Sequence, residues 1–141
     1  ELDTIRKMGK SVSLKEFCEL LEREIRIVYQ KKKDDNIRNY TILKAISYIR
    51  EHYAERISLE DVAGRLNISS EYLSTLFRRE IGINFSTFVS EFRVSQAKKI
   101  LKGSDMKIYE ISEKVGFTDT KYFNKVFKDI VGVSPKEYRE K

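Results

Sequence analysis

Apolar residues recur at helical spacing along most of this chain, and the pattern is clearest in residues 107–138. A short helix, a tight turn, a longer helix and a stop follow one another there. We expect Gly116 to supply the turn, because glycine adopts a positive φ at little cost, and Thr118 to cap the longer helix. The apolar stripes of the two helices are Ile108, Ile111 and Val115, then Phe123, Val126, Phe127 and Ile130.

The same pattern occurs once before, in residues 58–82. Ser58 and Asp61 match a capping box at the start of its first helix. Asn67 stands at the turn, since asparagine tolerates the left-handed conformation, and Ser69 can cap the second helix. Because the buried pattern and the exposed face both recur, the chain is expected to contain two helix-turn-helix motifs.

A long helix in about residues 84–102 joins the two motifs, and another helix in residues 39–54 precedes them. Ser134 followed by Pro135 begins a last short helix. The predicted fold is all-α, with two helix-turn-helix subdomains joined by a long linker helix and preceded by an extra N-terminal helix. The apolar stripe of the linker helix is Phe85, Phe88, Val89, Phe92, Gln96, Ala97 and Ile100.

The extra N-terminal helix is expected to begin at a capping box of Ser13 and Glu16 and to run to about residue 33, before a polar linker in residues 31–36. Its apolar residues are spaced alternately four and three apart, as in a heptad repeat. They are Leu14, Cys18, Leu21, Ile25 and Val28. Two interpretations stay open: the helix packs on its own or a missing domain, or it dimerises.

Residues 1–38 are expected to be a helical linker or the end of a missing sensor or receiver domain, and residues 39–141 a domain of their own. Since the sequence begins with Glu1, we expect it to be part of a longer protein. Cys18 lies on the apolar seam, which predicts a small core residue there.

Composition favours a polyanionic partner, because the net charge is +6 and the isoelectric point is about 9.3. Cys18 is the single cysteine and His52 the single histidine, which gives no metal-ligand set and no nucleophile–base pair. We therefore expect no metal, no cofactor and no enzymatic activity. No run approaches the ~18 apolar residues of a membrane span, and the lone cysteine fits a cytoplasmic protein.

The polar faces opposite the buried stripes are candidates for contacts to double-stranded DNA. Glutamate can accept from cytosine, asparagine can pair with adenine, lysine can donate to guanine, and a threonine methyl can meet that of thymine. The expected base-contacting residues are Ser70, Glu71, Ser74 and Thr75 in the first motif, and Thr120, Lys121, Asn124 and Lys125 in the second.

Contacts to phosphate are expected from Arg78 and Lys128, one turn farther along, and from the helix N-termini at Ser69 and Thr118. A linker helix of about 18 residues spans ~27 Å at 1.5 Å per residue. Adjacent major grooves on one face of B-DNA recur every ~34 Å. One chain could therefore place two recognition helices in adjacent grooves.

The end of the chain resembles the C-terminal signature of the AraC/XylS family of bacterial transcription regulators. The matching residues are Gly116, Phe117, Tyr122, Phe123, Phe127, Lys128, Gly132, Ser134, Pro135, Tyr138 and Arg139. The resemblance extends back to about Tyr40. It implies seven helices, two motifs in adjacent major grooves and base contacts from the stripes named above. Residues 10–17 also resemble the last helix of a response-regulator receiver domain.

The competing interpretation is a tandem helical module that binds protein and dimerises through the N-terminal heptad helix. The expected partners are a double-stranded DNA operator, RNA polymerase as a further candidate, and a second copy of the chain, with no membrane.

Overall fold

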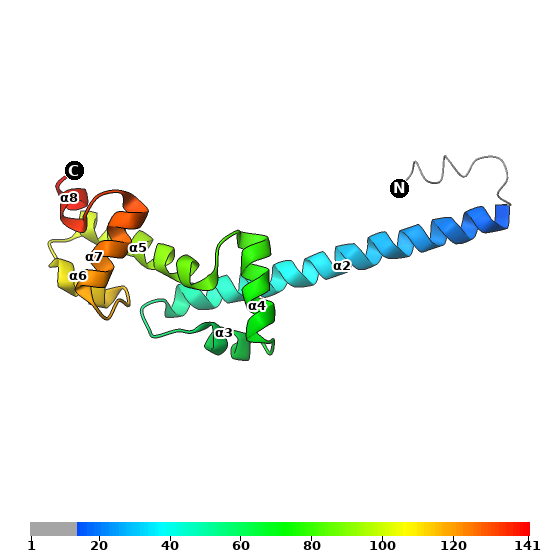
Figure 1. Cartoon of the computed structure of the whole chain (residues 1–141), viewed down its shortest axis with the longest axis horizontal. Coiled ribbons are helices and arrows are strands. Elements are labelled where there is room, and N and C mark those ends of the chain that lie inside the picture. Colours follow the sequence, from blue (N-terminus) through cyan, green and yellow to red (C-terminus); the bar gives the residue numbers. More distant parts are fainter. Residues whose placement is uncertain (1–13) are drawn as a thin grey trace. The chain divides into compact units, whose positions relative to one another are not determined.

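The structure is a computed structural model, and it describes residues 14–141 of the chain. This part of the chain contains seven α-helices, a short π-helical turn and no strand, which confirms the all-α prediction (Figure 1). The helices are α2 (Leu14–His52), α3 (Leu59–Arg65), α4 (Ser70–Leu76), α5 (Phe85–Gly103), α6 (Ile108–Lys114), α7 (Thr120–Val131) and α8 (Pro135–Glu140), with the π-helical turn at Phe77–Ile81.

Contacts divide the chain into two compact units, residues 1–39 and residues 40–141. The predicted break at residues 31–36 is wrong, because α2 is helical throughout this stretch. Gln30 donates to the Asp34 carboxylate at 3.0 Å, and Arg38 pairs with Asp35 at 2.7 Å. Such pairs three and four residues apart stabilise a polar helix. The capping box predicted at Ser13 lies outside the described residues.

The apolar seam of the N-terminal unit is exposed. The exposed fraction is 81% at Leu14 and 60% at both Ile25 and Val28. Cys18 is exposed too, so its predicted place in a core is wrong. A heptad pattern shows which side of a helix is apolar, but it does not show what covers that side.

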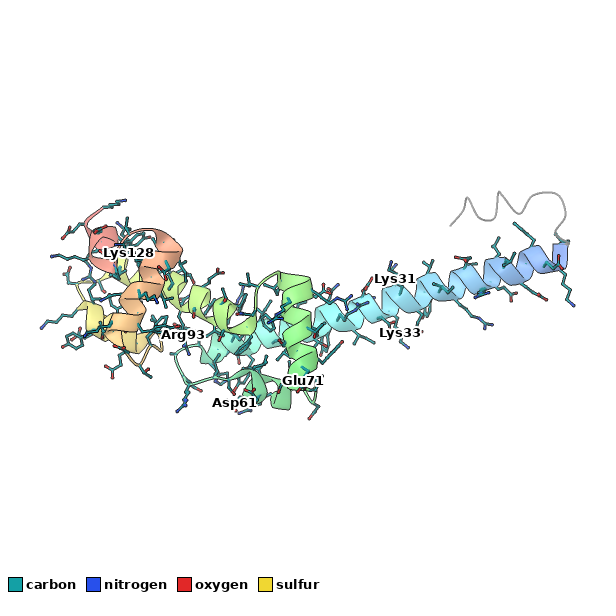
Figure 2. The ribbon with its side chains drawn as sticks, viewed as in Figure 1. Lys31, Lys33, Asp61, Glu71, Arg93 and Lys128 are labelled. Carbon is teal, nitrogen blue, oxygen red and sulfur yellow. The ribbon has the colours of Figure 1, made fainter. Side chains whose placement is uncertain are left out.

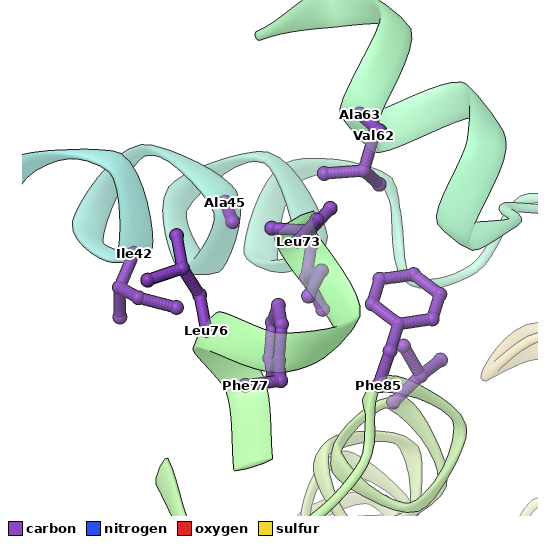
Figure 3. Packing of buried hydrophobic residues seen from close by; sticks show 10 residues of the cluster. Ile42, Ala45, Val62, Ala63, Leu73, Leu76, Phe77 and Phe85 are labelled. Carbon is purple, nitrogen blue, oxygen red and sulfur yellow. The ribbon is translucent and has the colours of Figure 1, made fainter. Parts of the chain in front are cut away.

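In the second unit, the first motif packs around Phe77, which is fully buried (Figure 3). Its ring lies edge-on to the rings of Phe85 and Phe88, with centroids 5.6 Å apart in both pairs. The end of α2, both helices of the motif and the start of α5 supply this cluster. Its buried residues are Ile42, Ala45, Ile49, Val62, Ala63, Leu73, Leu76, Phe77, Phe85 and Val89.

The second motif packs around Phe123 and Phe127, on the later half of α5. Tyr138 of α8 lies edge-on to Phe127, with ring centroids 5.7 Å apart, and so packs the last helix onto the second motif. Ile130 was expected in this core but is 42% exposed. Val131 packs against the cluster at that end of α7 instead. The buried members are Val94, Ala97, Leu101, Ile111, Val115, Phe117, Phe123 and Phe127.

Two arginines bind backbone carbonyls near helix C-termini, where carbonyl groups lack helical partners. Arg93 of α5 donates to the carbonyls of Tyr53 at 2.7 Å and Glu55 at 2.9 Å, just after α2. Arg139 of α8 donates to Leu101 at 3.2 Å and to Met106 at 2.6 Å. Burial lowers the pKa of Arg93, but an arginine stays charged at neutral pH. Arg93 thus ties α5 to the segment that enters the first motif.

The turns of the two motifs have the predicted left-handed residues, Asn67 with φ 55° and Gly116 with φ 104°. The predicted cap at Thr118 is wrong: Asp119 caps α7, accepting from the Lys121 amide at 3.0 Å. Aspartate is the stronger capping residue of the two neighbours. The caps predicted at Ser58 with Asp61, at Ser69 and at Ser134 are confirmed, and Asn84 caps α5.

Gly116→Ala should destabilise the domain more than Gly132→Ala, as measured by urea unfolding. Both glycines have positive φ, so alanine costs about 1–2 kcal/mol at either. At Gly116 a Cβ would also lie 2.6 Å from the Tyr53 carbonyl oxygen, whereas nothing lies within 4 Å at Gly132. We expect a further loss of ~1–3 kcal/mol at Gly116. Equal losses would show that the close approach is not maintained in solution.

Candidate nucleic-acid interface

The exposed face of the first motif lies on α4, opposite the buried Leu73 and Leu76. Glu71 and Thr75 are exposed there, and Ser70 and Ser74, each the residue before one of them, are half-buried. The Thr75 hydroxyl donates to the Glu71 carbonyl at 2.9 Å. Its hydrogen is therefore used within the helix, which leaves the methyl group and an oxygen lone pair for a partner.

Ser69 and Arg78 lie at the two ends of this face. The Ser69 hydroxyl accepts from the Tyr72 amide at 3.1 Å, so its side chain is engaged in capping α4. Arg78 is exposed in the π-helical turn that follows α4. Figure 2 labels Glu71 on this motif, and that carboxylate offsets the charge of Arg78.

The face of the second motif is strongly basic. Lys121, Asn124, Lys125 and Lys128 of α7 are all exposed, and Thr120 is half-buried at the start of the helix. Figure 2 labels Lys128 near the C-terminal end of α7. The ion pairs among the described residues are Arg38–Asp35 and His52–Glu55, so none neutralises these lysines.

A shallow groove of about 640 Å³ runs along this basic face. Four of the predicted residues lie together in it: Thr120, Asn124, Lys125 and Lys128. The groove also brings in residues that sequence reasoning missed, because their place beside α7 depends on how α6 and α8 fold back. These are Ile108 and Tyr109 of α6, and Ser134, Pro135 and Lys136 at the start of α8. No acidic residue lines it.

Thr118 lies in a different hollow. It lines a cleft of about 820 Å³ together with Thr120 and with residues from the loop between α2 and α3, here called the inter-motif cleft. The full lining is Ala54, Arg56, Ile57, Arg93, Tyr109, Ser112, Glu113, Gly116, Phe117, Thr118, Thr120 and Tyr122. Thr120 is thus the predicted base-contacting residue that lies in both hollows.

Within residues 14–141, no group of three or more His, Cys, Asp or Glu could hold a metal ion. His52 stacks on Tyr48 with ring centroids 4.3 Å apart, and its Nδ1 lies 3.2 Å from a Glu55 oxygen. His52 is therefore engaged in packing and pairing at the end of α2. In the same part of the chain, no helix is both long and apolar enough to span a bilayer.

Comparisons with known proteins place this geometry in context. A model of a helix-turn-helix domain matches residues 62–141. The regulatory protein PocR of Salmonella typhimurium is 39% identical over 97 residues, which cover 69% of this chain and 32% of that protein. The chain therefore spans about a third of the length of such a relative.

Solved structures agree with the sequence comparison. The C-terminal domain of the two-component response regulator yesN from Fusobacterium nucleatum is 36% identical, with a TM-score of 0.67, over 72% of this chain and 98% of that domain. The DNA-binding domain of AdpA, solved in complex with a target DNA, is 26% identical with a TM-score of 0.67, over 70% of this chain and 88% of that one.

Proposed function

Because the chain belongs to the AraC family of DNA-binding helix-turn-helix transcription regulators, we propose that its recognition helices α4 and α7 read base edges in adjacent major grooves of one operator. The observation that carries this proposal is the repeated motif on either side of one helix. α5 has 19 residues, which span roughly 28 Å at 1.5 Å per residue. With the width of the motifs added, this is compatible with the ~34 Å repeat of major grooves on one face of B-DNA.

In the first groove, Glu71 and Thr75 are the principal contacts, because they are the exposed members of their face. Glu71 accepts from a cytosine amino group and Thr75 offers its methyl group to thymine. Ser70 and Ser74 have short side chains and are half-buried, so a base must come close to the helix backbone to contact them. Arg78 binds phosphate, and Ser69 contributes the N-terminus of α4.

In the second groove, Asn124 pairs with adenine, and Lys121 and Lys125 donate to guanine. Thr120 lies beside them at the start of α7, Lys128 binds phosphate one turn on, and Thr118 precedes the helix. The chain acts by binding rather than catalysis, and it works in the cytoplasm, where bacterial DNA is found. RNA polymerase is a further partner compatible with this role.

Selection from a random duplex pool, followed by sequencing, tests the proposal. We expect a split motif with half-sites about one helical turn apart and an affinity ~10³-fold or more above random DNA. Moving the half-sites apart by half a helical turn should abolish this gain in affinity over random DNA, because one recognition helix would then face away from its groove. Enrichment of a single half-site, or none, would refute the two-groove arrangement.

The second motif should supply more of the salt-dependent affinity, because its face carries three lysines against one arginine and one glutamate on the first. Each phosphate charge that a lysine neutralises contributes about 0.9 to the salt slope. A lysine that reaches guanine in the groove also displaces counterions from the nearby phosphates, so Lys121→Ala with Lys125→Ala should lower the slope by up to about 1.8. The matched control replaces Lys99 and Lys114, exposed lysines that line neither hollow. An unchanged slope in the α7 variant would contradict this assignment.

We also propose that the exposed seam of α2 pairs with a second copy of the chain. Its spacing puts Cys18 and Ile25 at one core position of the heptad and Leu14, Leu21 and Val28 at the other, which is self-complementary in a parallel pair. Isoleucine and leucine at these positions favour a coiled coil of two helices. In a parallel pair, each residue at a core position faces the same residue of the other chain. The two Cys18 thiols would therefore lie close together.

Mild oxidation should therefore link two chains through Cys18, and Ile25→Lys should prevent the link and yield monomers in sedimentation. Ile27→Lys is the control, because Ile27 is similarly exposed, 52% against 60%, but lies off the seam. A monomeric wild-type chain, or an equal effect of both substitutions, would refute pairing through the seam.

A further inference from the structure

The inter-motif cleft lies beside Arg93, on the helix that joins the two motifs. One wall comes from the loop between α2 and α3, with Arg56. The other comes from α6, the turn and the start of α7, with Thr118 and Tyr122. Figure 2 labels Arg93 on α5 between these two walls. The cleft is therefore built by the loop that enters the first motif, by the joining helix and by the second motif.

Arg93 gives the cleft a fixed positive charge, although its hydrogen-bonding groups are engaged. Its Nε and Nη2 donate to the Tyr53 and Glu55 carbonyls, and its guanidinium lies 5.7 Å from the centre of the Phe117 ring. Gly116 keeps this wall close, since a side chain there would meet Arg93 Nε at 2.9 Å. Arg93 therefore supplies charge and shape, and a ligand must take its hydrogen bonds from other groups.

The available donors lie around the rim. Arg56 is exposed and has neither an ion pair nor a hydrogen bond among the described residues. Thr118 is exposed, and Tyr122, which also lines the cleft, is 54% exposed. The Tyr109 hydroxyl is not free, because it donates to a Glu110 carboxylate oxygen at 3.5 Å. The two arginines outweigh the single carboxylate of the lining, Glu113.

The N-terminus of α7 borders the cleft through Thr118 and Thr120, but the capping Asp119 carboxylate already offsets the positive end of its helix dipole. Ser112 also lines the cleft, is 1% exposed, and its hydroxyl has no hydrogen-bond partner among the described residues. A buried polar group without a partner is uncommon and calls for an explanation.

The geometry of DNA identifies the anion. Two adjacent major grooves on one face of a duplex are separated by a minor groove with a sugar–phosphate strand on each side. A protein with one recognition helix in each groove must face those strands with whatever lies between its motifs. We propose that the inter-motif cleft seats the DNA backbone between the two half-sites, with Arg56 bound to a phosphate and Thr118 donating beside it.

This inference rests on the proposed function and adds a contact to it. A phosphate held between the motifs carries no base information. It would raise affinity for all sequences and would favour simultaneous engagement of both motifs. Arg56 therefore differs in role from the residues on α4 and α7, which discriminate between bases.

The test compares the full chain with Arg56→Ala and Arg56→Lys on the selected duplex and on random duplex, at several salt concentrations. Arg56→Ala should lower the salt slope by about 0.9 on both duplexes, leave the ratio of the two affinities unchanged, and be largely rescued by Arg56→Lys. Arg50→Ala is the matched control, because Arg50 is exposed at the end of α2 and lines neither hollow. It should leave the slope unchanged.

A scan with methylphosphonates, which remove the charge of one phosphate at a time, locates the contact. A neutral linkage between the half-sites should weaken binding by wild type and have little further effect on Arg56→Ala. An equal penalty in both proteins, or a wild-type salt slope in Arg56→Ala, would overturn the inference.

Two other outcomes are distinguishable. If inorganic pyrophosphate raises the melting temperature of wild type but not of Arg56→Ala, while the DNA salt slope is the same in both, the cleft binds a small anion and the inference is wrong. If wild type selects no duplex at all, the proposed function itself fails. If wild type selects a split site and Arg56→Ala leaves the salt slope unchanged, the inference is wrong and the proposed function stands.

Discussion

Both motifs depend on α5, because this one helix contributes buried residues to each core. Phe85 and Val89 belong to the first cluster, and Val94, Ala97 and Leu101 to the second. Arg93 stands between these two sets and binds the chain that leaves α2. A bidentate guanidinium on two carbonyls fixes direction as well as distance. The second motif is therefore attached to the first by packing and hydrogen bonds as well as by the chain.

The exposed polar faces of α4 and α7 are the sides of these helices that the two cores do not bury. Burying Leu73 and Leu76, or Phe123 and Phe127, turns the opposite side of each helix to solvent. The two faces then differ in charge, near-neutral on α4 and basic on α7. The inter-motif cleft has a charge pattern of its own, because Arg56 and Arg93 line it against a single carboxylate, Glu113.

Sequence reasoning succeeded where local chemistry decides the outcome. Capping residues, the left-handed turns at Asn67 and Gly116 and the strongest apolar stripes depend on neighbours within about one helical turn. It failed where two local options were close in free energy. Residues 31–36 looked like a linker because they are polar, yet pairing along the helix keeps them helical. Asp119, next to Thr118, caps α7 in its place.

The sequence by itself determined the helices, the two motifs and the polar faces, because helical periodicity and caps are properties of short stretches. Only the tertiary structure decided which residues from other parts of the chain lie beside those faces. Arg93 reaches carbonyls about 40 residues away, Lys136 joins the groove of α7, and Arg56 joins Thr118 across one cleft. No local sequence pattern encodes these long-range contacts, because they depend on how α5 positions one motif against the other.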